Sequence, residues 1–139
     1  MKESSWNDCV EGNTAVKISP DRARAKSLVE TAAERIKLTS EINEKNCNFV
    51  FEDYYTSIME MLQAIVLSNG YKISNHVCLG YYIRDVLKRT DLYVLFGDVR
   101  YKRNSLTYYG KRMDFETALH AIEKCKRIIK EIKTGLLKG

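Results

Sequence analysis

Hydrophobic residues recur along most of the chain at steps of three and four positions, the spacing that gathers them on one face of an α-helix. Five such stretches follow one another and are separated by capping and turn-forming residues. The clearest stripe lies near the C-terminal end and comprises Phe115, Leu119, Ile122, Cys125, Ile129 and Ile132. The pattern therefore predicts an almost entirely helical protein.

Residues that begin or end helices set the predicted boundaries. Ser19, Ser74 (or its neighbour Asn75) and Asp114 can each cap a helix N-terminus, and Asn69–Gly70 can supply a left-handed exit. The predicted helices cover approximately residues 19–44, 50–68, 76–88, 90–110 and 115–135. Because the connections are short, neighbours should be antiparallel. We expect an all-α fold, a five-helix up-and-down antiparallel bundle that occupies residues 19–139 as one domain, with residues 1–18 as an N-terminal tail or loop.

Composition supports a globular chain. The protein has 139 residues and a mass of 16.1 kDa, which suits one domain, and its 45% hydrophobic and 29% charged residues exclude wholesale disorder. No apolar run approaches the roughly 18 residues that span a bilayer, and the N-terminus lacks an apolar signal core. We expect a cytoplasmic protein that does not contact a membrane.

The cysteines and histidines indicate no metal site. Cys9, Cys47, Cys78 and Cys125 form no Cys-x-x-Cys pair, and the two histidines are far apart in the sequence. We expect all four cysteines to be reduced and partly buried, as is typical of cytoplasmic proteins. No cofactor or metal is predicted.

The positive charge is concentrated at the C-terminal end. Residues 1–97 contain 12 basic and 13 acidic side chains, whereas residues 98–139 contain 11 basic and 5 acidic ones, a net of +6. Lys126, Lys130 and Lys133 repeat at helical spacing in the last predicted helix. This row is either a solvated helix face or a surface for phosphate.

A second basic cluster is mixed with aromatic residues between Asp98 and Gly110. Such mixtures bind RNA because Arg and Lys pair with phosphates while rings stack on bases. Arg103 and Tyr108 are five positions apart, about 140° around a regular helix. They should therefore meet at one ligand only if the helix ends or kinks between them, or if a second subunit supplies one of them.

The string from Arg103 to Gly110 resembles the signature region of HEPN domains, in which an Arg, often followed by Asn, precedes a His by four to six intervening residues. Arg103–Asn104 matches the first pair, and Tyr108 stands at the His position. The resemblance implies a dimeric helical bundle whose motif residues from two subunits meet in a cleft. Many such domains are metal-independent ribonucleases, and others partner nucleotidyltransferases in toxin–antitoxin or defence systems.

The resemblance assigns the candidate site. Arg103 and Tyr108 are the catalytic candidates, although a tyrosine with an ordinary pKa of about 10 is a poor base at neutral pH. The candidate substrate-binding residues are Arg100, Lys102, Asn104, Lys111 and Arg112. The competing interpretation of Arg103 and Asn104 is a structural pair that bridges neighbouring helices.

Three functions are compatible with these patterns. The first is a HEPN-like RNA- or nucleotide-binding domain that is also a degenerate ribonuclease. The second is a non-catalytic homodimer that partners a nucleotidyltransferase, a nuclease or an antitoxin. The third is a carboxylate metal site built from Glu52, Asp53 and Glu60, which the absence of any Glu-x-x-His sequence disfavours. Whether the chain is an enzyme stays open at this point.

Overall fold

The computed structural model describes residues 2–136 and is mostly helical, which confirms the predicted class. Its long helices are α2 (Arg22–Leu38), α3 (Cys47–Ser68), α5 (Thr90–Tyr109) and α6 (Phe115–Glu131). Shorter elements are α1 (Trp6–Glu11), α4 (His76–Tyr81), the π-helical turns η1 (Tyr82–Val86) and η2 (Ile132–Leu136), and the strands β1 (Ala15–Lys17) and β2 (Tyr71–Ile73).

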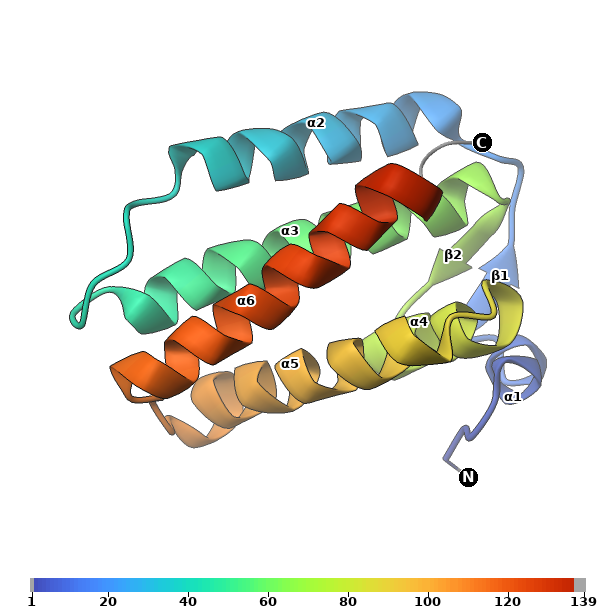
Figure 1. Cartoon of the computed structure of the whole chain (residues 1–139). Coiled ribbons are helices and arrows are strands. Elements are labelled where there is room, and N and C mark those ends of the chain that lie inside the picture. Colours follow the sequence, from blue (N-terminus) through green and yellow to red (C-terminus); the bar gives the residue numbers. More distant parts are fainter. Residues whose placement is uncertain (1, 137–139) are drawn as a thin grey trace.

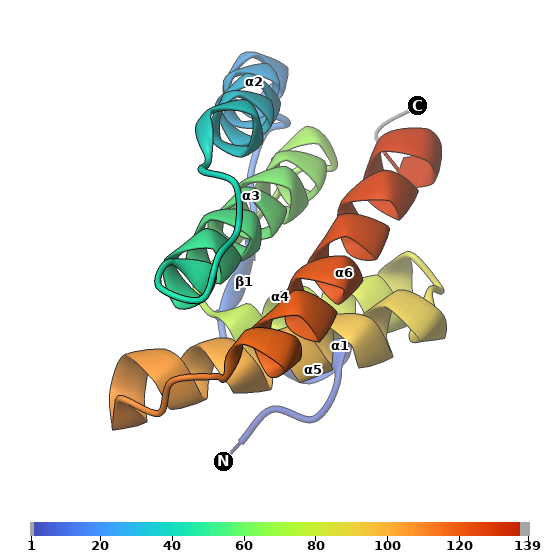
Figure 2. The ribbon, with the colours of Figure 1, turned by 60° about the vertical axis from the view of Figure 1, so that its left-hand side comes forward.

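Helix α3 is the central element of the molecule. Helix α2 packs along one side of it and α6 along another, while α5 packs against α6 and α3 (Figures 1 and 2). More than half of the residues of α3 are buried, which is why its sequence is apolar on nearly all sides. The largest fully buried side chains of the core are Tyr82, Phe51, Phe96, Ile58, Met61 and Leu79.

Helix α2 is shorter than the sequence predicts. Asp21, not Ser19, caps it by accepting a hydrogen bond from the N–H of Arg24 at 3.0 Å. The helix ends at Leu38, well before residue 44. Thr39 has an extended backbone at this point, and its hydroxyl donates to the Asp53 carboxylate of α3 at 2.7 Å. Asn43 then accepts from the backbone N–H groups of residues 45 and 46 in a separate turn.

The prediction of a tail or loop over residues 1–18 is wrong for the part that the structure describes. Helix α1 and strand β1 lie there, and β1 pairs with β2 in an antiparallel two-stranded sheet that an all-α fold does not anticipate. The Trp6 ring packs edge-on against Tyr71 and Tyr82, with ring centroids 5.2 and 5.0 Å away. Its backbone N–H donates to Asp85 at 2.8 Å. The segment is therefore an integral part of the fold.

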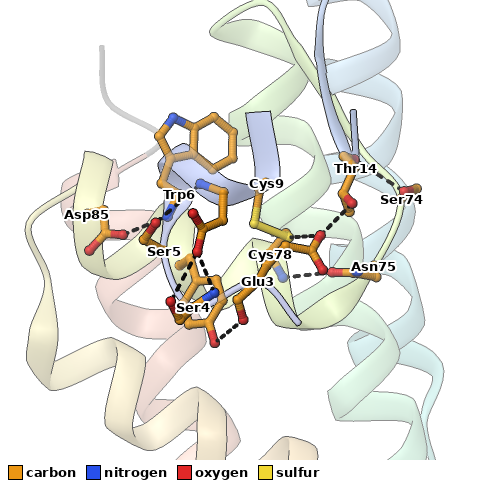
Figure 3. Close-up of a disulfide and its surroundings, with 12 residues drawn as sticks. Glu3, Ser4, Ser5, Trp6, Cys9, Thr14, Ser74, Asn75, Cys78 and Asp85 are labelled. Carbon is orange, nitrogen blue, oxygen red and sulfur yellow. Dashed lines mark hydrogen bonds between the residues drawn. A yellow bond between two sulfur atoms is a disulfide. The ribbon is translucent and has the colours of Figure 1, made fainter. Parts of the chain in front are cut away.

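A disulfide joins this segment to the bundle. Cys9 of α1 and Cys78 of α4, 69 positions apart in the sequence, are bonded and fully buried (Figure 3). The prediction of four reduced cysteines is thus wrong for this pair, because the β1–β2 pairing brings α1 against α4. Cys47 and Cys125 are free and buried, as predicted. Disulfides are typical of oxidising compartments, so the cytoplasmic location stays a prediction.

The chain reaches α4 through a left-handed glycine and a capped turn. Gly70 has a φ of +83°, which confirms the predicted exit from α3. Asn75 caps α4 by accepting from the N–H of Cys78 at 2.8 Å. The single helix predicted over residues 76–88 instead widens into η1, where the N–H of Leu87 donates to the carbonyl of Tyr82.

Helices α5 and α6 begin and end close to the predicted residues. Gly110 ends α5 with a φ of +60°, and Asp114 caps α6 by accepting from the N–H of Thr117 at 2.8 Å. The buried Asn48 of α3 clamps the connection between them: its amide donates to the carbonyl of Met113 and accepts from the N–H of the same residue, at 3.0 and 2.9 Å. This clamp fixes where α5 ends relative to α3.

Candidate functional site

A pocket of about 230 Å³ lies where α3, α4 and α5 meet. Its lining side chains come from all three helices: Glu52, Tyr55, Thr56, Met59, His76 and Arg103. It therefore contains a guanidinium, an imidazole, a phenol and a carboxylate. These are the groups that acid–base chemistry at a phosphate requires.

His76 and Tyr55 form the buried side of this pocket. The Tyr55 hydroxyl and Nδ1 of His76 are 3.0 Å apart and share a hydrogen bond. Burial raises the pKa of Tyr55 to about 12, so the phenol stays protonated at neutral pH. Burial, together with the charges of Arg103 and Arg100, lowers the pKa of His76. The imidazole is therefore neutral near pH 7 and able to take up a proton.

Two rings and an amide hold Arg103 at the mouth of the pocket. Its guanidinium carbon lies 5.6 Å from the ring centroid of Tyr55 and 5.6 Å from that of Tyr108, within the range of cation–π attraction. One of its N–H groups donates to the side chain of Asn104 at 3.5 Å. Within residues 2–136, no carboxylate forms a salt bridge with Arg103. The guanidinium is thus available to an anionic ligand, although the Glu52 carboxylate lines the same pocket.

Arg103 and Tyr108 contact each other within helix α5, although they are five positions apart. That the two meet at one ligand stays a prediction. Helix α5 continues to Tyr109, and the two long side chains reach across the angular gap. Tyr108 does not line the pocket, however, and 67% of its surface is exposed. Its ring covers the outer face of the Arg103 guanidinium rather than the interior of the site.

The remaining sequence-predicted residues surround the pocket without lining it. Arg100 is half-buried and acts on His76 and Tyr55 through its charge. Lys102 helps to lower the pKa of Asp114, after the hydrogen bonds of Thr117. Lys111 and Arg112 are exposed in the connection between α5 and α6. The structure thus places Arg103 in the pocket, with Asn104 bonded to it and Arg100 near enough to act on its lining, and leaves the other three basic residues outside the lining.

Sequence reasoning missed His76 and Tyr55 as site residues, and it considered Glu52 only as a metal ligand, not beside Arg103. They lie on α3 and α4, between 27 and 51 positions before Arg103, so no local spacing connects them to it. The available signal was the position of His76 directly after the predicted cap Asn75, because the first residue of a helix projects from its end.

The described residues offer no obvious metal centre. Within residues 2–136, the one close cluster of ligand-type side chains is Glu3, Cys9 and Cys78. Both sulfur atoms of that cluster are in the disulfide, and the Glu3 carboxylate accepts from the Thr14 hydroxyl (Figure 3). A disulfide offers no thiolate, which is the form of cysteine that binds metals.

Comparisons with protein-family models, with curated proteins and with solved structures found no match. The resemblance to HEPN domains therefore rests on residues 103–110 and on the order of the helices. Among the helices that the structure describes, none combines the length and the apolar character needed to cross a membrane.

Proposed function

We propose that this chain is a HEPN-like RNA-binding domain whose pocket cleaves the bound strand without a metal. One observation carries the proposal: Arg103 and His76 line the same pocket. In the HEPN motif a histidine stands at the position of Tyr108. Here His76, from another helix, supplies the group that titrates near neutral pH. Both groups belong to a single chain, so each subunit has its own pair.

The geometry supports a simple reaction. The hydrogen bond between Tyr55 and His76 allows either group to donate, and the reaction uses the tautomer in which Nδ1–H donates to the Tyr55 oxygen and Nε2 is unprotonated. The RNA 2′-oxygen attacks phosphorus, its proton passes to Nε2, the bond from phosphorus to the 5′-oxygen breaks, and the imidazolium protonates that oxygen. The products are a 2′,3′-cyclic phosphate and a 5′-hydroxyl. Arg103 stabilises the charge on the phosphorus oxygens.

Exposed rings on α5, the helix that carries Arg103, support single-stranded RNA as the ligand. Tyr101, Tyr108 and Tyr109 of α5 are 69%, 67% and 80% exposed, far more than tyrosines that only fill the core edge. Base stacking on such rings is worth about 1–3 kcal/mol per base and tolerates any sequence. The basic residues around them attract the backbone in the same region.

The first test compares Arg103→Ala with Arg24→Ala, a control arginine that is exposed at the start of α2. Binding of a labelled single-stranded RNA is measured by fluorescence anisotropy at several salt concentrations. Loss of one phosphate contact should weaken binding and reduce the log–log salt slope by about 0.7, with little change in stability. A large fall in stability with an unchanged slope would assign Arg103 a structural role.

The second arm of the same test measures cleavage in the presence of a chelator. His76→Gln should abolish cleavage while it retains RNA binding, because the amide cannot take up a proton. Tyr108→Phe should retain cleavage, because its ring only covers Arg103. Intact RNA after long incubation with the wild-type protein would refute the proposed nuclease activity but not the proposed RNA binding.

A second candidate function, a non-catalytic homodimer that partners a nucleotidyltransferase, a nuclease or an antitoxin, is favoured by the same exposed aromatic residues. Tyr101 and Tyr109 of α5 and Phe49 of α3 are large and exposed, which is typical of surfaces that meet another protein. The five-helix HEPN-like arrangement and its dimer belong to this proposal too. A dimer in sedimentation together with RNA binding that is insensitive to Arg103→Ala would place this candidate first.

A further inference from the structure

A second hollow lies on the other side of α3, away from the Arg103 pocket. It is a groove of about 380 Å³ between α2 and α6, with Tyr54 of α3 lining it. Tyr54 and Tyr55 are consecutive residues of one helix, about 100° apart around its axis, so each faces a different hollow. The groove and the pocket are therefore separate sites.

The groove exists because α2 and α6 each pack mainly on α3 rather than on one another. Helix α2 packs along α3, whereas α6 packs against α3 and α5. Figure 2 shows α2 and α6 on different sides of α3. The space between them is lined by Ile36 of α2, Tyr54 of α3 and Ile129 of α6. A ligand lying there would bury apolar surface against three helices.

A row of lysines borders this apolar surface. Three exposed lysines line the groove: Lys126 and Lys130 on α6, and Lys133 on the π-helical turn η2 that follows it. Lys126 lies 3.8 Å from Glu123 and 5.8 Å from the ring centroid of Tyr54. Over residues 2–136, no salt bridge involves Lys130 or Lys133. Seven positions along a helix span about 10 Å, so the row presents positive charge over two helical turns.

We propose that this groove binds an acidic amphipathic helix of a partner protein. The apolar side chains of such a helix would cover Ile36, Tyr54 and the small exposed part of Ile129, and carboxylates spaced three or four residues apart would face the lysine row. Helix-in-groove binding uses this combination of apolar anchors and flanking charges. The incoming helix would fill the space that α2 and α6 leave open over α3.

Two other ligands fit the groove less well. RNA would pair with the lysines, but Tyr54 offers one ring for a base, already covered in part by Lys126, and Ile36 and Ile129 offer none. A fatty acid would cover the apolar surface, yet its single carboxylate would leave most of the lysine row unused. An acidic helix matches both features at once.

The experiment uses a displayed library of short helices that carry Leu or Ile on one face and random residues at the flanking positions. Binders selected on the full chain should be enriched in Asp and Glu at those positions. Lys130→Glu should weaken the best of them about tenfold or more, because it replaces an attraction with a repulsion. Arg127→Glu is the matched control: Arg127 is exposed on α6 but does not line the groove.

Circular dichroism and thermal unfolding establish that both variants are folded. Selection without acidic enrichment, or acidic binders that Lys130→Glu and Arg127→Glu weaken equally, would overturn the proposal. Sodium oleate or a single-stranded oligonucleotide that shifts the methyl resonances of Ile36 and Ile129, with no acidic peptide bound, would overturn it in favour of that ligand.

Discussion

Three features of its environment affect the protonation of the His76 imidazole. Burial disfavours its charged form, the guanidinium groups of Arg103 and Arg100 repel it, and Tyr55 hydrogen-bonds one of its nitrogens. Glu52 lines the same pocket. The residues of this site illustrate what a sequence can predict: Arg103 lies in a contiguous basic and aromatic segment, whereas His76 and Tyr55 join it only through packing. No spacing rule connects three helices before their arrangement is known.

The lowered pKa of His76 predicts how stability depends on pH. Because the folded state holds this proton less tightly than the unfolded state, with its ordinary pKa of 6.5, stability is fully present above that value and falls as the pH drops below it. The free energy of unfolding, measured by urea titration from pH 8 to 5, should therefore decline less in His76→Gln than in the wild-type protein.

The pH range is chosen to separate His76 from the carboxylates. Asp91, whose pKa the Arg89 hydrogen bond lowers to about 2, contributes stability that is lost only in stronger acid. His120→Gln, at an exposed position on α6, is the control. Equal effects of the two substitutions on the pH profile would mean that the pocket does not disfavour the charged form of His76.

At the scale of the helices, most observed boundaries depend on residues that are close together in the sequence. The apolar stripe of α6 and its cap at Asp114 were predictable because both depend on residues within one or two turns. The early end of α2, the π-helical turn η1 and the two short strands were not, because each depends on contacts with distant segments. The connection between α5 and α6 combines the two cases, since Gly110 marks it locally and Asn48 holds it from α3.

Asn48→Ala should destabilise the protein by about 2 kcal/mol. The change removes two hydrogen bonds and leaves the N–H and carbonyl of Met113 without their partners. Chemical unfolding in urea measures the loss, with Asn7→Ala, at an exposed position in α1, as control. Asn48→Ala should also increase amide exchange in the connection between α5 and α6. An effect no larger than that of the control would show that this clamp is not required.

In the molecule as a whole, the N-terminal segment is attached to the bundle at several points. The β1–β2 ladder, the Trp6 packing and the Cys9–Cys78 bond all connect residues 2–18 to the region around α4 (Figure 3). Cys78 follows His76 by two residues in α4, so this attachment also supports the pocket. The sequence could not predict it, because two cysteines 69 positions apart carry no signal of pairing.

The last prediction concerns this disulfide. A bond that closes so long a loop restricts the unfolded chain, and its removal typically costs about 2–4 kcal/mol. Cys9→Ser combined with Cys78→Ser should lower the unfolding temperature, and dithiothreitol should bring the wild-type protein down to nearly the same value. The reductant should leave the double variant unchanged, since Cys47 and Cys125 are free thiols. Loosening α4 should also weaken the hold on His76, so cleavage should fall further than RNA binding. If dithiothreitol left the unfolding temperature of the wild-type protein unchanged, the bond would not be what holds this segment in place.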